Sequence, residues 1–530
     1  MSIATGSYRT LKPETRNLGA TMHPRARRNL MLETSAVVEI HDLRFAYHSP
    51  TKSEAPVLER RGEHESSVNS FDGIVCDDGR FKAWYHVHPS SIRGEWPAES
   101  PISAYAESSD GIHWERPELG IIEFRGSRKN NYTDLPFSCF SIMPDVTGEH
   151  RYLAVGNMIR DSIPRDRWPW DDLKDGYYTA HSEDGLHWQI HPEPIALTRC
   201  DVVSGAYDEL EGRYVIIPKI NTRYQGLLLR TMCWADAKEF GRWGPIHPVL
   251  QPGEEDFLEA RRHGAVGMDF QRMTILPYRD VTLGFVTCHY LDPSYSPSGA
   301  CTHGTNNVQL VWQEKRLRQG GHHPLYPDCH EYDPRVEEAS PYGARWRFIP
   351  GRPAFLQGGS ERGVAADVNT APMLEVGDEM WMYYTASTDW HGETQRKGEY
   401  EFTQGAVEFY KEFGSGAIWR ATMPRDRFVS LWANVHGMVE LRHGSRDGEK
   451  LFVNARCPRG CIKAELVDQD AYQPLPGYEV GNCIGFTGDA VKGEIRWKEK
   501  EVSDIPVDTN LTIRFHVETG DLFAYEFGEE

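Results

Sequence analysis

The chain has 530 residues, of which 39% are hydrophobic and 11% aromatic, a globular composition in a chain too long for one hydrophobic core. Its formal net charge of −20 argues against nucleic acid or an anionic membrane as a partner, because neither is attracted to such a field. No stretch approaches the about 20 apolar residues of a membrane span, and residues 1–30 lack the apolar run of a signal peptide. We therefore expect a cytoplasmic protein.

The ten cysteines stand at irregular positions, and only Cys457 and Cys461 are close together. No second pair completes a zinc site with them. A mixed group of His and Cys in a polar insertion also lacks a recurring spacing; it consists of His322, His323, Cys329 and His330. We predict no metal and no cofactor, apart from a structural ion, which the sequence leaves open.

A short turn motif occurs twice in the first half of the chain. Residues 108–114 (SSDGIHW) recur as residues 182–188 (SEDGLHW), each after an alternating segment. Asp-Gly suits a turn that needs a positive φ, and the tryptophan can anchor the outgoing strand on the sheet face. The motif predicts hairpins within a repeated β unit.

A second series of strands interleaves with these turns. Its members begin near residues 72, 138, 201, 269 and 367, at intervals of 66, 63, 68 and 98 residues. The last interval is lengthened by a polar insertion, residues 316–344. Five four-stranded units of this length predict a five-bladed β-propeller, a closed ring without free edges. A β-sandwich is the alternative, but it gives no reason for a period of about 65 residues.

The two ends of the chain have a different sequence pattern from the middle. From about residue 431, short alternating segments such as 451–455 and 462–467 are separated by Gly and Pro turns, which is typical of an antiparallel β-sandwich. Residues 1–65 predict an extended arm that packs on the propeller and adds a strand to its last blade. The fold class is therefore all-β, with an arm (1–65), a propeller (66–430) and a sandwich (431–530).

Acidic residues stand at four of the five predicted blade starts: Asp72, Asp201, Asp269 and Asp367. Because the first strand of each blade begins at the rim of the central channel, equivalent positions bring these side chains to one site. Glycoside cleavage uses two carboxyl groups, a proton donor and a base or nucleophile. An aspartate before a strand also caps backbone N–H groups, which is the plainer explanation of each one alone. Crowding predicts a raised pKa for at least one of them.

Further candidates lie near the predicted rim. Glu259, in the charged segment 254–263 before the fourth blade, is a candidate proton donor, although a solvated loop explains the segment equally simply. The predicted substrate-binding residues, besides Asp367, are Arg261, Arg262, His263, His391, Trp168 and Trp170.

Segments 105–120, 130–131, 377–384, 460–466 and 522–527 give the chain a family resemblance. In them it resembles a bacterial branch of the glycoside hydrolase family 32 and 43 superfamily. That resemblance implies a five-bladed propeller with a C-terminal sandwich. At the positions of the family's acid motifs, Asp72 matches the nucleophile, residues 137–140 (FSCF) have no acid in register, and Asp201 replaces a glutamate.

The leading hypothesis is a glycoside hydrolase or transglycosidase that acts on a small carbohydrate or glycoconjugate. In it Asp72 is the base or nucleophile, Asp201 or Glu259 the proton donor, and Asp269 orients the substrate. The alternatives are a carbohydrate-binding propeller without catalysis and a propeller enzyme that acts on a non-sugar metabolite. A binding protein would have its channel acids far apart or neutralised by arginine, whereas an enzyme needs a carboxyl pair about 5–9.5 Å apart.

Overall fold

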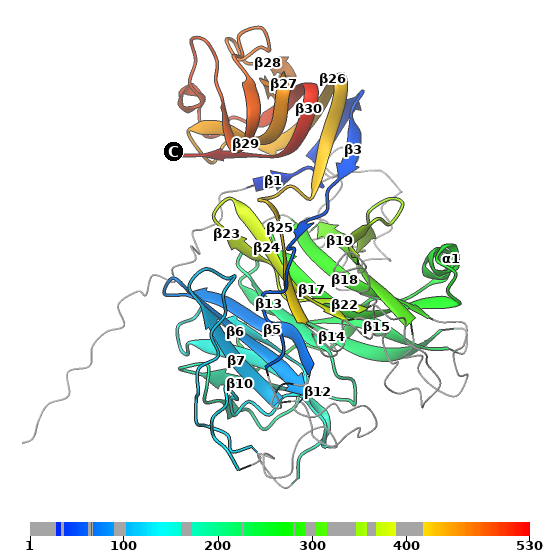
Figure 1. The fold of residues 1–530 in the computed structure, drawn as a ribbon. Helices are drawn as coiled ribbons and strands as arrows, with labels where there is room; N and C mark the ends of the chain where they lie inside the picture. Colours follow the sequence, from blue (N-terminus) through cyan, green and yellow to red (C-terminus); the bar gives the residue numbers. More distant parts are fainter. Residues whose placement is uncertain are drawn as a thin grey trace, which may run out of the picture.

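The computed structural model of the chain shows an assembly of antiparallel sheets (Figure 1). It describes residues 28–32, 36–61, 65, 67–88, 102–124, 126–160, 172–224, 227–278, 281–291, 304–314, 346–357, 367–387 and 417–529. Within these ranges α1 (Glu254–Arg262) is the only α-helix. None of the helices so described is long and apolar enough to cross a membrane.

Five groups of strands follow one another along the chain, and we call them units 1 to 5. Unit 1 has the order β5-β6-β7, and in unit 2 β8-β9-β10 is extended by β11 and β12, both of which pair with β10. The bounds in unit 1 are β5 (Ser67–Asp77), β6 (Arg80–His88) and β7 (Ile102–Ser108). Those in unit 2 are β8 (Phe140–Pro144), β9 (Tyr152–Met158), β10 (Gly176–Ser182), β11 (Gln189–Ile190) and β12 (Ala196–Leu197).

Units 3 to 5 repeat this meander. Unit 3 consists of β13 (Val203–Asp208), β14 (Arg213–Tyr224), β15 (Leu227–Ala237) and β16 (His247–Leu250). Unit 4 consists of β17 (Gly267–Pro277), β18 (Val281–Leu291) and β19 (Gly304–Glu314), with β20 (Arg347–Phe348) and β21 (Ala354–Gln357) both on β19. Unit 5 places β22 (Asp367–Thr370) and β23 (Leu374–Val376) on β24 (Glu379–Ser387), beside β25 (Ala417–Pro424).

The first strands of the units lie next to one another. β5 contacts β8, β8 contacts β13, β13 contacts β17, and β22 contacts both unit 4 and β5. Gly73 in β5 pairs in parallel with Ile142 in β8, and a Cβ at this glycine would lie 2.5 Å from the Cβ of Ile142. The apolar cores lie between neighbouring units, as where Trp234 of unit 3 packs with Phe270 of unit 4. The first strands of units 1 to 4 thus lie side by side in order, and β22 of unit 5 returns to β5.

The repeated turn motif connects unit 2 with unit 1 and unit 1 with unit 5. Gly111 and Gly185 have φ values of +71° and +79°, as the Asp-Gly pattern predicts. The carbonyl of Gly185 accepts a hydrogen bond from Trp84 Nε1 in unit 1 at 2.6 Å. The carbonyl of Gly111 accepts one from the hydroxyl of Tyr383 in unit 5 at 2.8 Å. The motif therefore serves packing between units as well as the turn.

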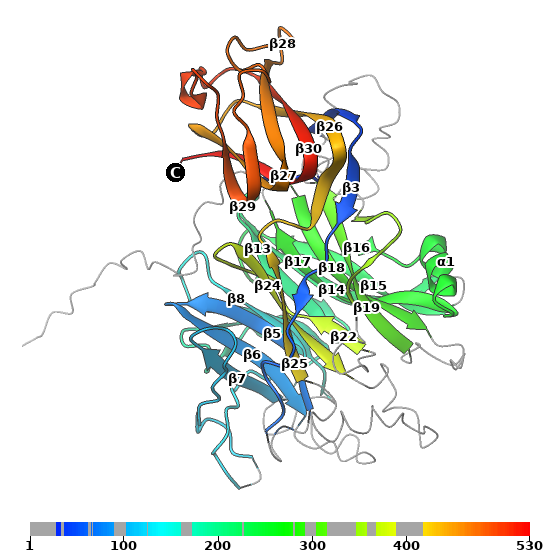
Figure 2. The same cartoon turned by 45° about the horizontal axis from the view of Figure 1, so that its top comes forward.

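The C-terminal residues form one sheet of long strands, which Figures 1 and 2 show beyond the five units. Its main strands are β26 (Val429–Gly444), β30 (Leu511–Gly528) and β27 (Lys450–Asp468), flanked by β28 (Gln473–Pro474) and β29 (Phe486–Ile495). Residues 451–455 and 462–467, predicted as separate strands, are both parts of β27. The strand continues because a register shift between Arg456 and Cys461 absorbs the intervening Pro and Gly.

The N-terminal segment pairs with both parts of the molecule. β1 (Arg28–Leu30) pairs with β30, and β2 (Val37–His41) and β3 (Arg44–Tyr47) pair with β26. β4 (Thr51–Lys52) then pairs with β25 and completes the sheet of unit 5, as the sequence predicts for the arm. The segment runs down from the C-terminal sheet to unit 5 in both views (Figures 1 and 2).

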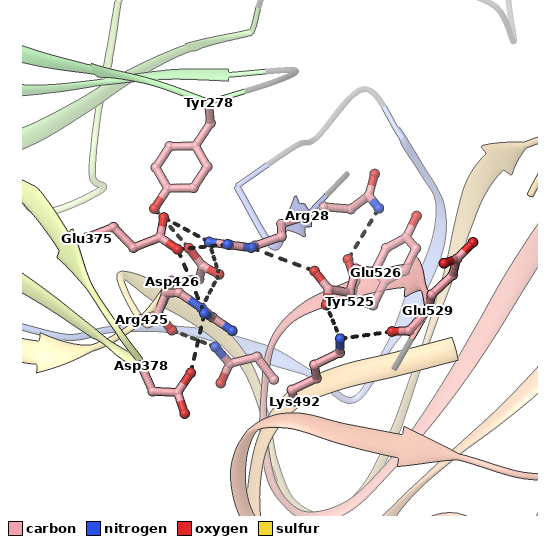
Figure 3. A network of polar contacts seen from close by, with 12 residues as sticks. Arg28, Tyr278, Glu375, Asp378, Arg425, Asp426, Lys492, Tyr525, Glu526 and Glu529 are labelled. Carbon is pink, nitrogen blue, oxygen red and sulfur yellow. Dashed lines mark hydrogen bonds and ion pairs between the residues drawn. The ribbon is translucent and has the colours of Figure 1, made fainter. Parts of the chain in front are cut away.

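A polar network joins these three parts (Figure 3). The Arg28 guanidinium lies 2.8 Å from Glu375 of unit 5, 3.4 Å from Asp426 and 3.6 Å from Glu526 of β30. The hydroxyl of Tyr278, just after β17, donates to Asp426 at 2.8 Å. Burial raises the pKa of Asp426, although the charge of Arg28 opposes the shift. One arginine thus holds carboxylates from unit 5, the C-terminal sheet and the connection between them.

Candidate active site at the ring of first strands

Asp72 lies at a distortion of β5. The register with β6 shifts on either side of Phe71, and the Asp72 side chain is fully buried. Arg272 of β17 donates to its Oδ1 at 2.8 Å, and His86 Nδ1 lies 2.5 Å from its Oδ2. Burial alone would raise the pKa of this carboxyl, but His86 and Arg272 outweigh it and lower the pKa. Asp72 is therefore an ionised group closed to solvent.

Asp269 has an equivalent arrangement in unit 4, with its side chain 1% exposed. Arg230 of β15 lies 3.3 Å from its Oδ1, and His289 Nδ1 of β18 lies 3.1 Å from the same oxygen. Burial raises the pKa of Asp269, and Arg230 and His289 lower it by more, to about 2. A bulge between Phe270 and Arg272 interrupts the alternation of side chains along β17. Asp269 and Arg272 of this strand therefore both take part in ion pairs with other units.

Asp201 differs from the other two aspartates in its exposure. It stands just before β13, its side chain is 52% exposed, and it forms an ion pair with Lys219 of β14. Burial of its surroundings raises the pKa of Asp201, but the charges of Lys219 and Arg230 dominate and hold it far below its ordinary value. Among the three aspartates, Asp201 is the carboxylate that a ligand can reach.

Cys139 connects these groups. It is partly exposed and lies in the electrostatic field of Asp201, Asp72, Arg272 and Lys219. Burial and the two carboxylates raise the pKa of its thiol, so it stays protonated. We call the resulting set the central network; it comprises Asp72, His86, Cys139, Asp201, Lys219, Arg230, Asp269, Arg272 and His289. Three of the predicted catalytic residues thus belong to one set of interacting groups.

The expectation of a raised pKa in this group is wrong for all three aspartates. Like charges would raise the pKa of a crowded carboxyl, but here each carboxylate has a cation of its own. Asp72 has Arg272, Asp201 has Lys219, and Asp269 has Arg230. None of the three is therefore a proton donor near neutral pH.

The cations of the central network escaped the sequence analysis. Lys219 and Arg230 stand inside strands whose other residues are largely apolar, and both are buried. A charge inside a buried strand needs a partner, and that is the signal by which they could have been found. Arg230 pairs with Asp269 across units 3 and 4, and Lys219 of β14 pairs with Asp201 before β13, so neither pairing follows from a local pattern.

Glu259 lies in a separate cluster on α1. Its carboxylate is 5% exposed and accepts hydrogen bonds from Arg262 of the same helix at 3.0 Å and from His263, the C-cap residue, at 3.1 Å. The ring of His263 packs against Tyr290 of β18. Arg261 is exposed to solvent. Two of the three predicted binding residues of this segment, Arg262 and His263, are thus paired with Glu259.

The side chains of the remaining predicted residues lie outside the part of the chain that the structure describes. Asp367 begins β22 and pairs with Ser387, but its side chain lies outside the description. His391, Trp168, Trp170 and the insertion 316–344 also lie outside the described residues. In the described part of the chain, no group of three or more His, Cys, Asp or Glu residues could hold a metal ion.

No protein-family model and no curated protein matches the chain. Solved structures show a distant similarity. A BT0996 complex with RGII has a TM-score of 0.42 and 13% identity, covering 72% of this chain and 93% of that one. A thermostable family-43 glycoside hydrolase has a TM-score of 0.38 and 11% identity, covering 70% and 92%. The Bombyx mori GH32 β-fructofuranosidase BmSUC1 has a TM-score of 0.37 and 10% identity, covering 92% and 94%.

Proposed function

We propose that units 1 to 5 form a five-bladed β-propeller that binds a carbohydrate at the centre of its ring, where Asp201 is the contacting carboxylate. Contacts between successive first strands, together with the return of β22 to β5, support the closed ring. The observation that carries the function is the central network itself. It holds three ionised aspartates, each beside a cation, and exposes one of them.

The chemistry of Asp201 suits a sugar hydroxyl. An ionised carboxylate only accepts hydrogen bonds, and its bonds with neutral hydroxyl donors are charge-assisted. Lys219 fixes the position of Asp201 before a ligand arrives, so little ordering remains to be done on binding. Asp72 and Asp269 are closed to solvent and act through the cations that they orient. Neutralisation of each acid by a cation favours the binding protein over the hydrolase.

The test is binding by the Asp201→Asn protein. We expect at least a tenfold loss of affinity in isothermal titration against an array of neutral hexasaccharides (malto-, cello-, manno-, galacto- and xylohexaose), because asparagine removes the charge but keeps the shape. Asp489→Asn is the matched control: Asp489 is 54% exposed and pairs with the buried Arg427 in the C-terminal sheet. Equal affinities of Asp201→Asn and the wild type at the ring would refute the proposal.

Glycoside hydrolysis is the second candidate, because an accessible, ionised carboxylate also suits a base or nucleophile. Hydrolysis additionally needs a proton donor with a raised pKa within about 5–9.5 Å. Release of reducing sugar from the same hexasaccharides separates the two candidates. Release by the wild type that disappears in Asp201→Asn identifies a hydrolase, whereas binding without release identifies a binding protein.

A further inference from the structure

The outer face of the C-terminal sheet carries an ordered set of polar side chains. The register of β26, β30 and β27 aligns Glu440 with Arg514 and Glu465 in one row, and Met438 with His516 and Lys463 in the next. The alternate residues of these strands, such as Val439, Phe515 and Ala464, are buried in the apolar core of the sheet. The strand alternation therefore separates an apolar inner face from this polar one.

Arg514 organises the polar face. Its Nε donates to Glu440 Oε2 at 2.6 Å, and its Nη1 donates to Glu465 Oε2 at 2.9 Å. Its guanidinium also lies 5.5 Å from the ring centre of Tyr472, just before β28. Tyr472 is 51% exposed and has a φ of +53°. A solvent-facing aromatic ring thus stands beside a rigid Glu-Arg-Glu row.

Two polar atoms of these rows have no hydrogen-bond partner in the described part of the chain. Glu440 is 1% exposed, yet its Oε1 has no hydrogen-bond partner among the described residues. Nε2 of His516, in the neighbouring row, is likewise buried and lacks a partner within the same described ranges. Native proteins rarely leave buried polar atoms unpaired, because the lost hydrogen bond to water is costly. Such atoms on the polar face, beside the exposed ring of Tyr472, point to a ligand that supplies the missing partners.

The composition of the face identifies the class of that ligand. It offers the Oε1 acceptor of Glu440, which has no partner among the described residues, a ring nitrogen at His516 and an exposed aromatic face at Tyr472. Together they match hydroxyl groups and the flat side of a sugar ring. Glu440 and Glu465 are balanced by Arg514 and Lys463, so the face does not favour a strongly charged partner. We propose that this face is a second carbohydrate-binding site, specific for a neutral saccharide and separate from the central network.

The test compares two full-length variants against the same neutral hexasaccharide array by isothermal titration. Tyr472→Asn removes the aromatic ring, and asparagine tolerates the positive φ, so folding is preserved. We expect at least tenfold weaker binding at this site, with a comparable loss in Glu440→Gln. The matched control is Phe45→Asn, because Phe45 of β3 is also an exposed aromatic residue, at 43%.

The outcome separates this site from the proposed one at the ring. Wild type that binds two equivalents, one lost in Tyr472→Asn and the other in Asp201→Asn, supports both sites. Loss of all binding in Asp201→Asn, with unchanged binding in Tyr472→Asn and Glu440→Gln, would overturn the second site alone. Loss in Tyr472→Asn with full binding in Asp201→Asn would overturn the ring site alone. A wild type that binds no member of the array would overturn both.

Discussion

Gly185 shows how one residue of the repeated turn fixes the contact between two units. An added Cβ would lie 2.4 Å from Cζ2 of Trp84, a fully buried side chain. Gly185→Ala therefore combines an unfavourable positive φ with displacement of a core tryptophan. We expect a loss of about 3–4 kcal/mol in the free energy of unfolding, measured by urea denaturation.

Gly79 provides the matched control for this substitution. Its φ is +74°, close to the +79° of Gly185, but no atom lies within 4 Å of an added Cβ. Gly79→Ala should lose only the backbone component, about 1–2 kcal/mol. The difference between the two variants measures packing between the units. If both variants lose the same stability, the turn of unit 2 does not anchor unit 1.

At the scale of elements, β1 tests how the C-terminal sheet is held on unit 5. Arg28→Met removes the cation shared by Glu375, Asp426 and Glu526, which then keep only longer ion pairs with Arg425 and Lys492. We expect a loss of about 3–5 kcal/mol, and scanning calorimetry should resolve the C-terminal sheet as a separate transition. Arg80→Met, which removes an exposed pair with Glu107, should cost about 1 kcal/mol or less. A single, unshifted transition in Arg28→Met would show that the sheet is held by other contacts.

The sequence predicted where elements begin better than how they bend or pair. The polar residue before each apolar strand marks the starts near 138, 201, 269 and 367 within a few residues of β8, β13, β17 and β22. The break predicted near residue 458 is instead a bulge in β27, because Pro and Gly are tolerated where ladder bonds are interrupted.

The sequence predicted the aspartates of the candidate site but not the cations that pair with them. Aspartates at equivalent repeat positions are visible in the sequence, and three of them join one network. Their cations come from other strands and often other units, as with Asp72 in β5 and Arg272 in β17. Such pairs depend on how the strands and units pack against one another. For that reason the charge balance, and with it the direction of every pKa shift in the network, was not predictable.

At the scale of the whole molecule, the charge pairs at the ring predict how stability depends on pH. A carboxylate whose pKa is lower in the folded than in the unfolded chain stabilises the fold above its ordinary pKa. That stabilisation is lost as the pH falls through the folded value. Arg230 and His289 lower the pKa of Asp269 to about 2 against the effect of burial. The stabilisation that ionised Asp269 contributes is therefore lost between about pH 4 and pH 2.

Asp269→Asn removes this titration and leaves Arg230 without its carboxylate. At pH 7 the variant should be less stable than the wild type, by about 2 kcal/mol or more. The difference should shrink as the pH falls from 4 to 2, because the wild-type carboxyl becomes protonated and loses the same interaction. Urea midpoints at several pH values measure both curves. Curves that stay parallel from pH 7 to pH 2 would show that Asp269 is not ionised against Arg230, and the charge balance on which the proposed binding site rests would fail with it.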